Sequence, residues 1–397
     1  MPMDPTIVVV GHSRPAATAR LLDSVARADV DADVTLVVSI DHGAGATARR
    51  SAEVAEVADA FEWPHGPKVR LDHDGVGLVG HFHRVGDLTD EHDAIVVLED
   101  DLLVGKGFHR WARATLPMFD DDRIAGASLA APWFDGFRHH RFEPIDDGTD
   151  AFFAQVPWYD GMVFTRQAWR AYRAGHDGAA SARIPAAFDE LDDDEWFPDL
   201  VRYLVASDRQ WLLPRAAQAT GTGAPGVHFE QPTDWFQSEL ATDAPHPARL
   251  GALDTSGAVY DAHMEPTGET LRRLVPDLPE PLVGDFLGNR ELNHLDPSYW
   301  VVTTRPVRRP TRTWGARMHP LPMNLAFDEP GTDLTLGRVG DVEQGPAADA
   351  HAAAILGRHH ARGRQPGRRQ LLSELVQGSP LGRLTSLDRL TRTWRDR

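Results

Sequence analysis

The stretch AIVVLEDD at residues 94–101 decides the fold of this chain. Its unbroken aliphatic run lacks the polar alternation of a half-exposed strand and predicts a strand covered on both faces inside a parallel α/β sheet. Such sheets bind ligands at the carboxyl ends of their strands, where this run ends in Glu99, Asp100 and Asp101. These carboxylates would repel one another unless a cation joins them, and their hard oxygen atoms suit Mg²⁺ or Mn²⁺ with a phosphate-bearing substrate. The alternative interpretation is a solvated acidic turn.

Strand and helix signals alternate on both sides of this stretch. An apolar run at 7–10 ends at Gly11, and Pro15 then opens a segment of helical composition. Further strands are expected at 34–40, 69–71 and 124–130, and helices at 44–61, 77–85, 107–118 and 197–205. The alternation predicts an α/β fold with a Rossmann-like, mostly parallel central sheet, flanking helices and right-handed crossovers.

The sequence after residue 130 is less regular. Residues 132–160 are aromatic and polar without a clear period, which predicts binding loops and edge strands. Thr165 can cap a helix that runs through Tyr172, because its hydroxyl can satisfy an amide of the first turn. Residues 215–228 are rich in Gly, Ala, Thr and Pro, and we expect a lid there. From about residue 230 onward the pattern predicts no particular fold.

Composition excludes several classes of protein. The chain has 397 residues, a net charge of −18 and no cysteine. The acidic charge argues against a nucleic-acid binder, because phosphate backbones require a positive field. Without thiolates a metal must be held by Asp, Glu or His, and the lack of cysteine fits a reducing cytoplasm. No run reaches the roughly 18 to 20 apolar residues of a membrane span, and no basic leader opens the chain, so we expect neither export nor a spanning anchor.

Residues 358–397 form a separate, basic segment. They include ten arginines and three acidic residues, a net charge of +7, and Leu381, Leu384, Leu387, Leu390 and Trp394 recur at helical spacing. A basic amphipathic helix is expected, packed on its own domain or on a partner. The alternative is peripheral docking on anionic lipid at the inner face of the membrane.

Motifs over residues 6 to about 235 resemble, in the same order, those of the GT-A glycosyltransferases of the N-acetylglucosaminyltransferase I type. They are VVVGHSR at 8–14, VSIDHG at 38–43, GHFHR at 80–84, VLEDDL at 97–102, VPWY at 156–159, DDEW at 193–196 and GVHF at 226–229. The eukaryotic members carry a membrane anchor and cysteines, one of them where this chain has His42. Their Golgi context and glycoprotein acceptors are therefore not carried over.

The resemblance gives the acidic triad specific roles. It implies that Glu99, Asp100 and Asp101 are this chain's version of the DxD motif, with Asp101 as a ligand of Mn²⁺ or Mg²⁺. Glu99 and Asp100 would then contact the ribose or the donor sugar. A divalent cation that bridges the diphosphate would offset the charge that grows on the leaving nucleoside diphosphate.

Three residues upstream are candidates for nucleotide binding. Asp41, at the end of a predicted strand, could accept from the N3–H of uracil, as the resemblance implies, or it is only a turn residue before Gly43. Arg14 could pair with phosphate through the N–H groups of its guanidinium, or it is a surface arginine without a functional role. His81 falls where the family places a base-contacting histidine. His83 lies two residues further on, so the alignment with the family's histidine is uncertain by two residues. The alternative for His81 is a histidine packed in the core.

The general base is expected next to a tryptophan. In the related enzymes an acidic residue directly before a tryptophan takes the proton of the acceptor hydroxyl, which implies Glu195 here, with Asp194 as the second candidate. A solvated acidic loop is the other interpretation. The resemblance also implies that His228 contacts the metal or the phosphates.

Two aromatic residues are expected to shape the sugar and acceptor cleft. Trp158 and Tyr159 could do so because aromatic faces stack on carbohydrate, and core packing is the alternative for Trp158.

Together these features predict a metal-dependent, inverting glycosyltransferase of GT-A fold that uses a UDP-sugar, with UDP-GlcNAc as one candidate, and a saccharide acceptor of a bacterial surface glycan. The alternatives are a transferase with another donor, a nucleotidyltransferase on the same sheet, or a non-catalytic carbohydrate- or nucleotide-binding protein. The expected domains are a transferase domain at 1–240, an extension of unknown fold packed on it at 241–357, and the basic tail at 358–397.

Overall fold

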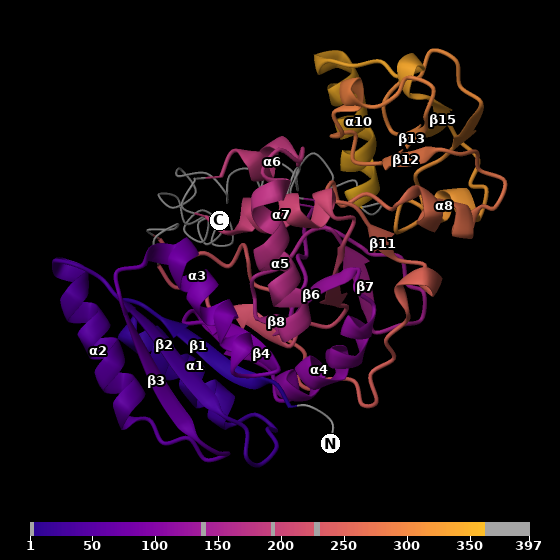
Figure 1. Ribbon diagram of the computed structural model, residues 1–397. Helices are drawn as coiled ribbons and strands as arrows, with labels where there is room; N and C mark the ends of the chain where they lie inside the picture. The colour runs from indigo at the N-terminus through magenta and orange to yellow at the C-terminus, as the bar shows by residue number, and fades with distance from the viewer. Residues whose placement is uncertain (1–3, 136–139, 192–194, 226–230, 362–397) are drawn as a thin grey trace, which may run out of the picture.

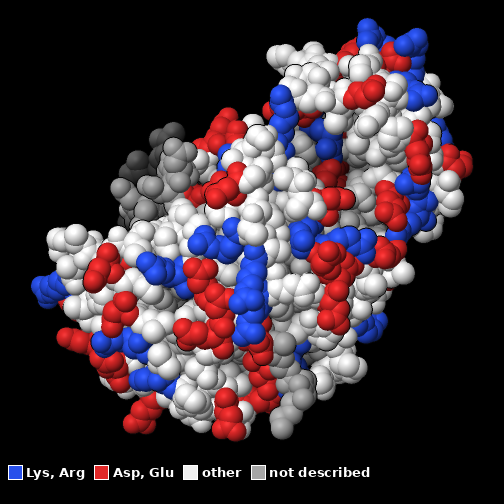
Figure 2. Space-filling model, viewed as in Figure 1, with Lys and Arg blue, Asp and Glu red and all other residues white. Residues whose placement is uncertain are grey.

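The computed structural model describes residues 4–135, 140–191, 195–225 and 231–361. Figure 1 shows a larger body that contains the elements up to β11, and a smaller body that holds β12, β13, β15, α8 and α10. Acidic and basic side chains are interspersed over the face of both bodies that Figure 2 presents.

A nine-stranded sheet forms the larger body, in the order β11-β7-β9-β6-β8-β4-β1-β2-β3. The pairs β1–β2, β2–β3, β1–β4, β6–β9 and β7–β11 are parallel, and β4–β8, β6–β8 and β7–β9 are antiparallel. The predicted α/β class with a mostly parallel sheet is therefore confirmed. The strands are β1 Thr6–Gly11, β2 Leu36–His42, β3 Lys68–Asp74, β4 Ala94–Glu99, β6 Ile124–Ser128, β7 Ala151–Ala154, β8 Met162–Thr165, β9 Gln210–Pro214 and β11 Val259–Tyr260.

Helices cover both faces of this sheet. Ile7 and Val9 of β1 belong to a core shared with α1, α2 and α4, whereas Val8 belongs to the core shared with α3, α5 and α7. Successive side chains of a strand point to opposite faces, so burial on both faces explains the unbroken apolar runs. The helices are α1 Pro15–Ala26, α2 Ala46–Ala60, α3 Gly77–Asp87, α4 Phe108–Thr115, α5 Arg166–Ala179, α6 Ala186–Asp189 and α7 Phe197–Ala206.

Most predicted elements appear within two residues of their expected ends. Thr165 caps α5 as predicted, because its Oγ accepts from the backbone N–H of Ala168 at 3.3 Å. The predicted helix at 107–118 is divided between α4 and a 3₁₀ turn, η2 Leu116–Asp120. Within 132–160 the described strand is β7, which lies between β9 and β11 and so is not an edge strand.

The smaller body has its own sheet, in the order β12-β13-β15-β14. Its core includes Trp314, Leu334 and Val302 of the sheet and Leu356 of α10. The elements are α8 Gly268–Leu274, β12 Leu282–Asp285, β13 Trp300–Thr303, β14 Arg312–Trp314, α9 Met323–Ala326, β15 Leu334–Arg338 and α10 Pro346–His360. Among the described residues, 3₁₀ turns also form in the larger body, at η1 Leu88–Asp90 and η3 Leu253–Thr255, and in the smaller body, at η4 Leu292–His294 and η5 Val339–Asp341.

Two expectations concern the membrane. No helix among the described residues combines the length and the hydropathy that crossing a bilayer requires. The expected amphipathic helix of the basic tail, and with it the lipid hypothesis, lies outside the described residues from 362 onward.

Candidate functional site

The carboxyl ends of β4, β1 and β2 lie side by side and carry the predicted residues. Val10 of β1 is in register with Glu99 of β4 and with Ser39 of β2. Arg14 follows β1 at the start of α1, and Asp41 is the second-last residue of β2. Parallel pairing therefore brings three of the predicted motifs to one edge of the sheet.

Arg14 bonds two carboxylates of the acidic triad at this edge of the sheet. Its Nη1 donates to Oδ2 of Asp101 at 3.0 Å, and its Nη2 donates to Oδ1 of Asp100. The side chain of Asp101 is 34% exposed, whereas that of Asp100 is 6% exposed. Asp101 is thus the more accessible of the two carboxylates for a ligand.

Burial makes the triad an unfavourable place for charge. Burial and, to a smaller extent, the neighbouring Asp101 and Asp100 together raise the pKa of Glu99 to about 8. Burial also raises the pKa of Asp100 to about 6, although the guanidinium of Arg14 opposes this shift. Oδ2 of Asp100 is buried without a hydrogen-bond partner in the part of the chain that the structure describes. The triad can therefore accept a cation that would stabilise its ionised forms.

Asp160 joins this cluster, and sequence reasoning missed it. β8 pairs antiparallel with β4, with Val97 opposite Met162, and Asp160 lies two residues before Met162, close enough for its charge to affect Glu99. The side chain of Asp160 is buried, and burial together with Asp101 raises its pKa to about 7. Its Oδ2 has no hydrogen-bond partner among the described residues. The available signal was an acid directly after the motif VPWY, before a glycine.

A separate two-stranded sheet lies next to the cluster. β5 Leu102–Val104, which directly follows the triad, pairs antiparallel with β10 Ala219–Gly221. The backbone N–H of Thr222 donates to the carbonyl oxygen of Asp101 at 2.7 Å, and the backbone of Gly221 hydrogen-bonds Asp160. Residues 219–222 of the segment predicted as a lid thus lie next to the triad. His228 lies outside the described residues.

Asp41 and His81 are both buried and already bonded. Oδ1 and Oδ2 of Asp41 accept from the backbone N–H groups of Val76 (2.9 Å) and Gly77 (3.0 Å), so the carboxylate caps the start of α3. Nε2 of His81 lies 2.8 Å from Oγ of Ser39. Burial lowers the pKa of His81 to about 4, which makes it a neutral imidazole at pH 7.

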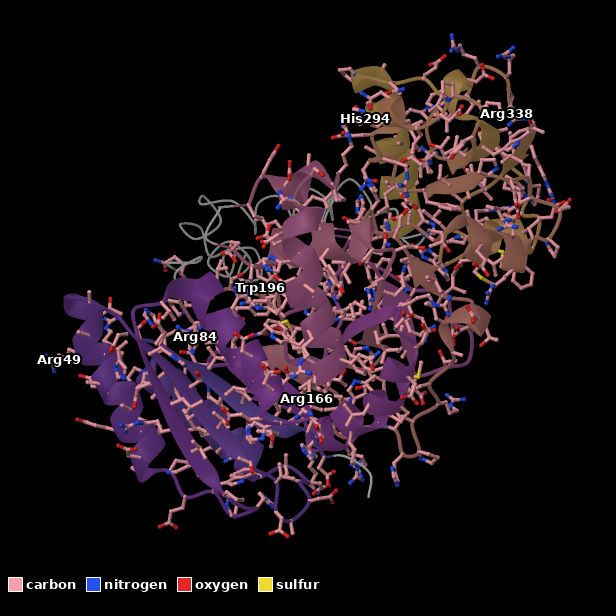
Figure 3. The ribbon with its side chains drawn as sticks, in the orientation of Figure 1. Arg49, Arg84, Arg166, Trp196, His294 and Arg338 are labelled. Atoms are coloured by element: carbon pink, nitrogen blue, oxygen red, sulfur yellow. The ribbon has the colours of Figure 1, made fainter. Side chains whose placement is uncertain are left out.

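The residue after Glu195 is packed in the core. Trp196 is buried, and its ring stacks on Phe82 of α3 with 4.7 Å between centroids and 13° between planes. Figure 3 labels Trp196 in the region between α3 and α7. Burial raises the pKa of Tyr159 well above its ordinary value, and among the carboxylates that add to this shift are Asp101 and Glu195. The charges of Glu195, the candidate general base, and of Asp101 in the triad therefore both raise the pKa of Tyr159. Asp194 lies outside the described residues.

The two predicted aromatic residues differ in exposure. Trp158 is buried, and its ring stacks on that of Tyr159 with centroids 4.6 Å apart. Tyr159 is partly exposed and also contacts Phe236, whose ring centroid is 6.5 Å away. Trp158 is packed in the core with its side chain next to Asp160, whereas Tyr159 is partly exposed.

The acidic cluster suits a hard divalent cation. Glu99, Asp100, Asp101 and Asp160 supply carboxylate oxygens alone, the donor type that Mg²⁺ and Mn²⁺ prefer. Two of these carboxylates have a buried oxygen without a partner among the described residues. The residues present therefore fit such an ion. The guanidinium of Arg14 supplies a positive charge and paired N–H donors for a phosphate group.

Comparisons with known proteins assign no family. No family model matches the chain, and no curated protein resembles it in sequence. The mannosyltransferase PcManGT from Pyrobaculum calidifontis, in complex with GDP-Man and Mn²⁺, is 13% identical with a TM-score of 0.29, over 42% of this chain and 45% of that one. The UTP-bound UGPase from Acinetobacter baumannii is 10% identical with a TM-score of 0.33, over 55% of this chain and 89% of that one.

A third structure gives similar values. The galactosyltransferase LgtC in complex with donor and acceptor sugar analogs is 15% identical with a TM-score of 0.30, over 50% of this chain and 70% of that one. The present chain spans less than half of the mannosyltransferase.

Proposed function

We propose that this protein is a metal-dependent, inverting glycosyltransferase that moves a sugar from a UDP-sugar to a hydroxyl of a saccharide acceptor. The observation that carries the proposal is the convergence of Glu99, Asp100, Asp101 and Asp160 with Arg14 at the carboxyl ends of β4 and β1. Nucleotide-sugar chemistry needs this combination, because a diphosphate requires both a divalent ion and a positively charged side chain. UDP-GlcNAc is one candidate donor, and a bacterial surface glycan is the candidate acceptor.

The residues divide into donor-binding and acceptor-activating groups. Asp101, the more exposed aspartate of the triad, would hold Mn²⁺ or Mg²⁺, with Asp160 close by. Such an ion would offset the charge that develops on the leaving diphosphate. Arg14 would leave the carboxylates and pair with phosphate oxygens. Asp41 would orient the uracil ring of the donor, since two backbone amides fix the position of the Asp41 carboxylate.

Glu195 is the proposed general base. It would take the proton of the acceptor hydroxyl as that oxygen forms a bond to the anomeric carbon, while the bond to the diphosphate breaks on the opposite face of the sugar. Packing of Trp196 against Phe82 limits how far the backbone of Glu195 can move. Fixed geometry of this kind is what a base requires.

Two other functions are compatible with the same fold. A non-catalytic carbohydrate- or nucleotide-binding protein would bind UDP or sugar without turnover, and a transferase with another donor would prefer a different nucleotide. A candidate base at Glu195, whose charge affects the same Tyr159 as the charge of Asp101, favours an enzyme, because a binding protein gains nothing from a base there.

Calorimetry with UDP, with and without Mn²⁺, tests the donor site. We expect binding that requires Mn²⁺, is lost in Asp101→Asn and is kept in Asp120→Asn, which changes an exposed aspartate that precedes β6. Absence of metal-dependent binding to any nucleoside diphosphate would contradict the proposal. Nucleotide release from a panel of nucleotide sugars then separates a UDP-sugar transferase from the two alternatives.

The proposed location is the cytoplasm, with the basic tail as a peripheral membrane contact. A cysteine-free chain is typical of a reducing compartment, and the arginines of residues 358–397 would attract anionic headgroups. Sedimentation with anionic vesicles should carry down the full chain and leave a chain truncated after 357 in solution. Equal sedimentation of the two would contradict the lipid contact.

A further inference from the structure

We infer that Glu143, His319 and His359 form a binding site for a divalent transition-metal ion at the junction of the two bodies. One nitrogen or oxygen atom of each residue lies within 4.8 Å of those of the other two. Two imidazoles and a carboxylate are a donor set that Zn²⁺ uses in proteins, with a further position for water or another side chain. Imidazole ligands favour Zn²⁺ and its relatives over Mg²⁺, so this site differs in chemistry from the acidic cluster.

His359 already has the tautomer that a ligand needs. Its Nδ1 lies 2.9 Å from the carbonyl oxygen of Ala316. A carbonyl oxygen can only accept, so Nδ1 carries the hydrogen and Nε2 presents its lone pair. Metal-ligating histidines commonly donate their other N–H in this way, which fixes the ring and raises its basicity.

His319 is presented by a rigid loop. Oδ1 of the buried Asn324 accepts from the N–H of Met318 at 2.9 Å, and its Nδ2 donates to the carbonyl oxygen of Met318 at 3.0 Å. The ring of His319 stacks on that of His359 with centroids 3.8 Å apart. Its Nδ1 lies 2.9 Å from Oε2 of Glu143, so the two residues already converge.

Glu143 is supplied by the larger body. The neighbouring Phe142 donates its backbone N–H to the carbonyl oxygen of Trp133 at 2.8 Å, and its ring packs on Tyr260 of β11. Nε of the exposed Arg141 lies 3.7 Å from Oε1 of Glu143. An ion held here would join the larger body to α10 and to the loop of His319.

The site has access and lies away from the acidic cluster. A cavity between the bodies is lined by Glu143, His359 and His360. The triad follows β4, whereas Phe142 packs on β11, five positions along the sheet. At about 4.8 Å for each strand, the separation is on the order of 20 Å. Two more imidazoles adjoin the site, since His360 stacks on His140 with centroids 4.5 Å apart.

The test is Zn²⁺ and Co²⁺ binding to the full chain after treatment with a chelator. We expect the wild type to bind one equivalent of Zn²⁺ more tightly than Glu143→Gln and His319→Gln, by about 10- to 100-fold or more. Co²⁺ should give a visible absorption band that both variants lose. The control is His351→Gln, which removes an exposed histidine of the same helix α10 and should change neither result.

Several outcomes would overturn the site. These are equal Zn²⁺ binding by the wild type and both variants, no Zn²⁺ binding by the wild type, or an equal loss in His351→Gln. Circular dichroism of the metal-free proteins shows whether the variants are folded, and both substitutions are at half-buried positions. Manganese-dependent UDP binding, measured on the same samples, reports separately on the proposed transferase.

Discussion

Arg14 donates from Nη1 to Oδ2 of Asp101 at 3.0 Å, which connects the start of α1 to the end of β4. A side-chain cation therefore neutralises the same carboxylates that we propose as metal ligands. When an ion takes Asp101, the guanidinium can exchange this carboxylate for phosphate oxygens. Arg14 would then link occupation of the metal site to capture of the diphosphate.

Substitution Arg14→Gln should weaken UDP binding in the presence of Mn²⁺ by about 10- to 100-fold, because a hydrogen bond to a charged group contributes about 1.5 to 3 kcal/mol. Calorimetry measures this change directly. The matched control is Arg49→Gln on α2, labelled in Figure 3, whose side chain is 88% exposed and pairs only with Glu53 among the contacts described. Unchanged affinity in Arg14→Gln would remove the residue from the phosphate site.

The carboxylates predict a pH dependence of the metal-free protein. The pKa of Glu99 is about 8 and that of Asp160 about 7, against ordinary values of 4.5 and 3.8. Between the ordinary and the raised pKa of each group, the folded chain holds more protons than the unfolded chain. These two groups therefore lower the stability of the folded chain as pH rises from about 5 to 8. Mn²⁺ competes with the same protons, and its affinity should rise over this range.

Thermal unfolding with a chelator at several pH values measures this effect. The decrease of Tm with pH should be smaller in Asp160→Asn than in the wild type, because one of the titrating groups is removed. Asp120→Asn, at an exposed aspartate, should follow the wild type. An identical slope in wild type and Asp160→Asn would show that Asp160 does not titrate in this range.

The sequence was most informative where neighbouring residues decide the structure. The run before Glu99 predicted a doubly covered strand, and the strands it joins placed Arg14 and Asp41 at the same edge. Asp160 could not be predicted, because its place beside Glu99 depends on the antiparallel pairing of β4 with β8, more than sixty residues away. The bonds from Asp41 to the start of α3 likewise join segments 35 and 36 residues apart.

The smaller body was not predicted for a related reason. Its strands have three to five residues, too few for a hydrophobic period to be recognised. Its core forms only when β12 to β15 pair with one another out of sequence order. The cluster of Glu143, His319 and His359 depends on contact between both bodies, so spacing along the chain carried no signal for it.

Asp41 should contribute to stability as well as to binding. Asp41→Ala leaves the N–H groups of Val76 and Gly77 without their acceptor, and the loss of a helix-capping side chain costs about 0.5 to 2 kcal/mol. Urea unfolding measures this cost. The control is Asp23→Ala, at an exposed position of α1, which should be nearly neutral. A stability equal to that of the control would mean that water replaces the carboxylate without loss.

Glu195→Gln separates the proposed base from the donor site. The amide cannot accept the acceptor's proton, so kcat should fall by about 10²- to 10⁴-fold, while the Kd for UDP with Mn²⁺ stays within about twofold of the wild type. Glu190→Gln, at an exposed position shortly before, controls for the loss of a negative charge in this segment and should keep full activity. Rates come from nucleotide release and affinities from calorimetry on the same preparations. A parallel loss of UDP affinity would reassign Glu195 to donor binding, whereas retained turnover would move the role of base to another carboxylate of the site, with Asp160 the first to test.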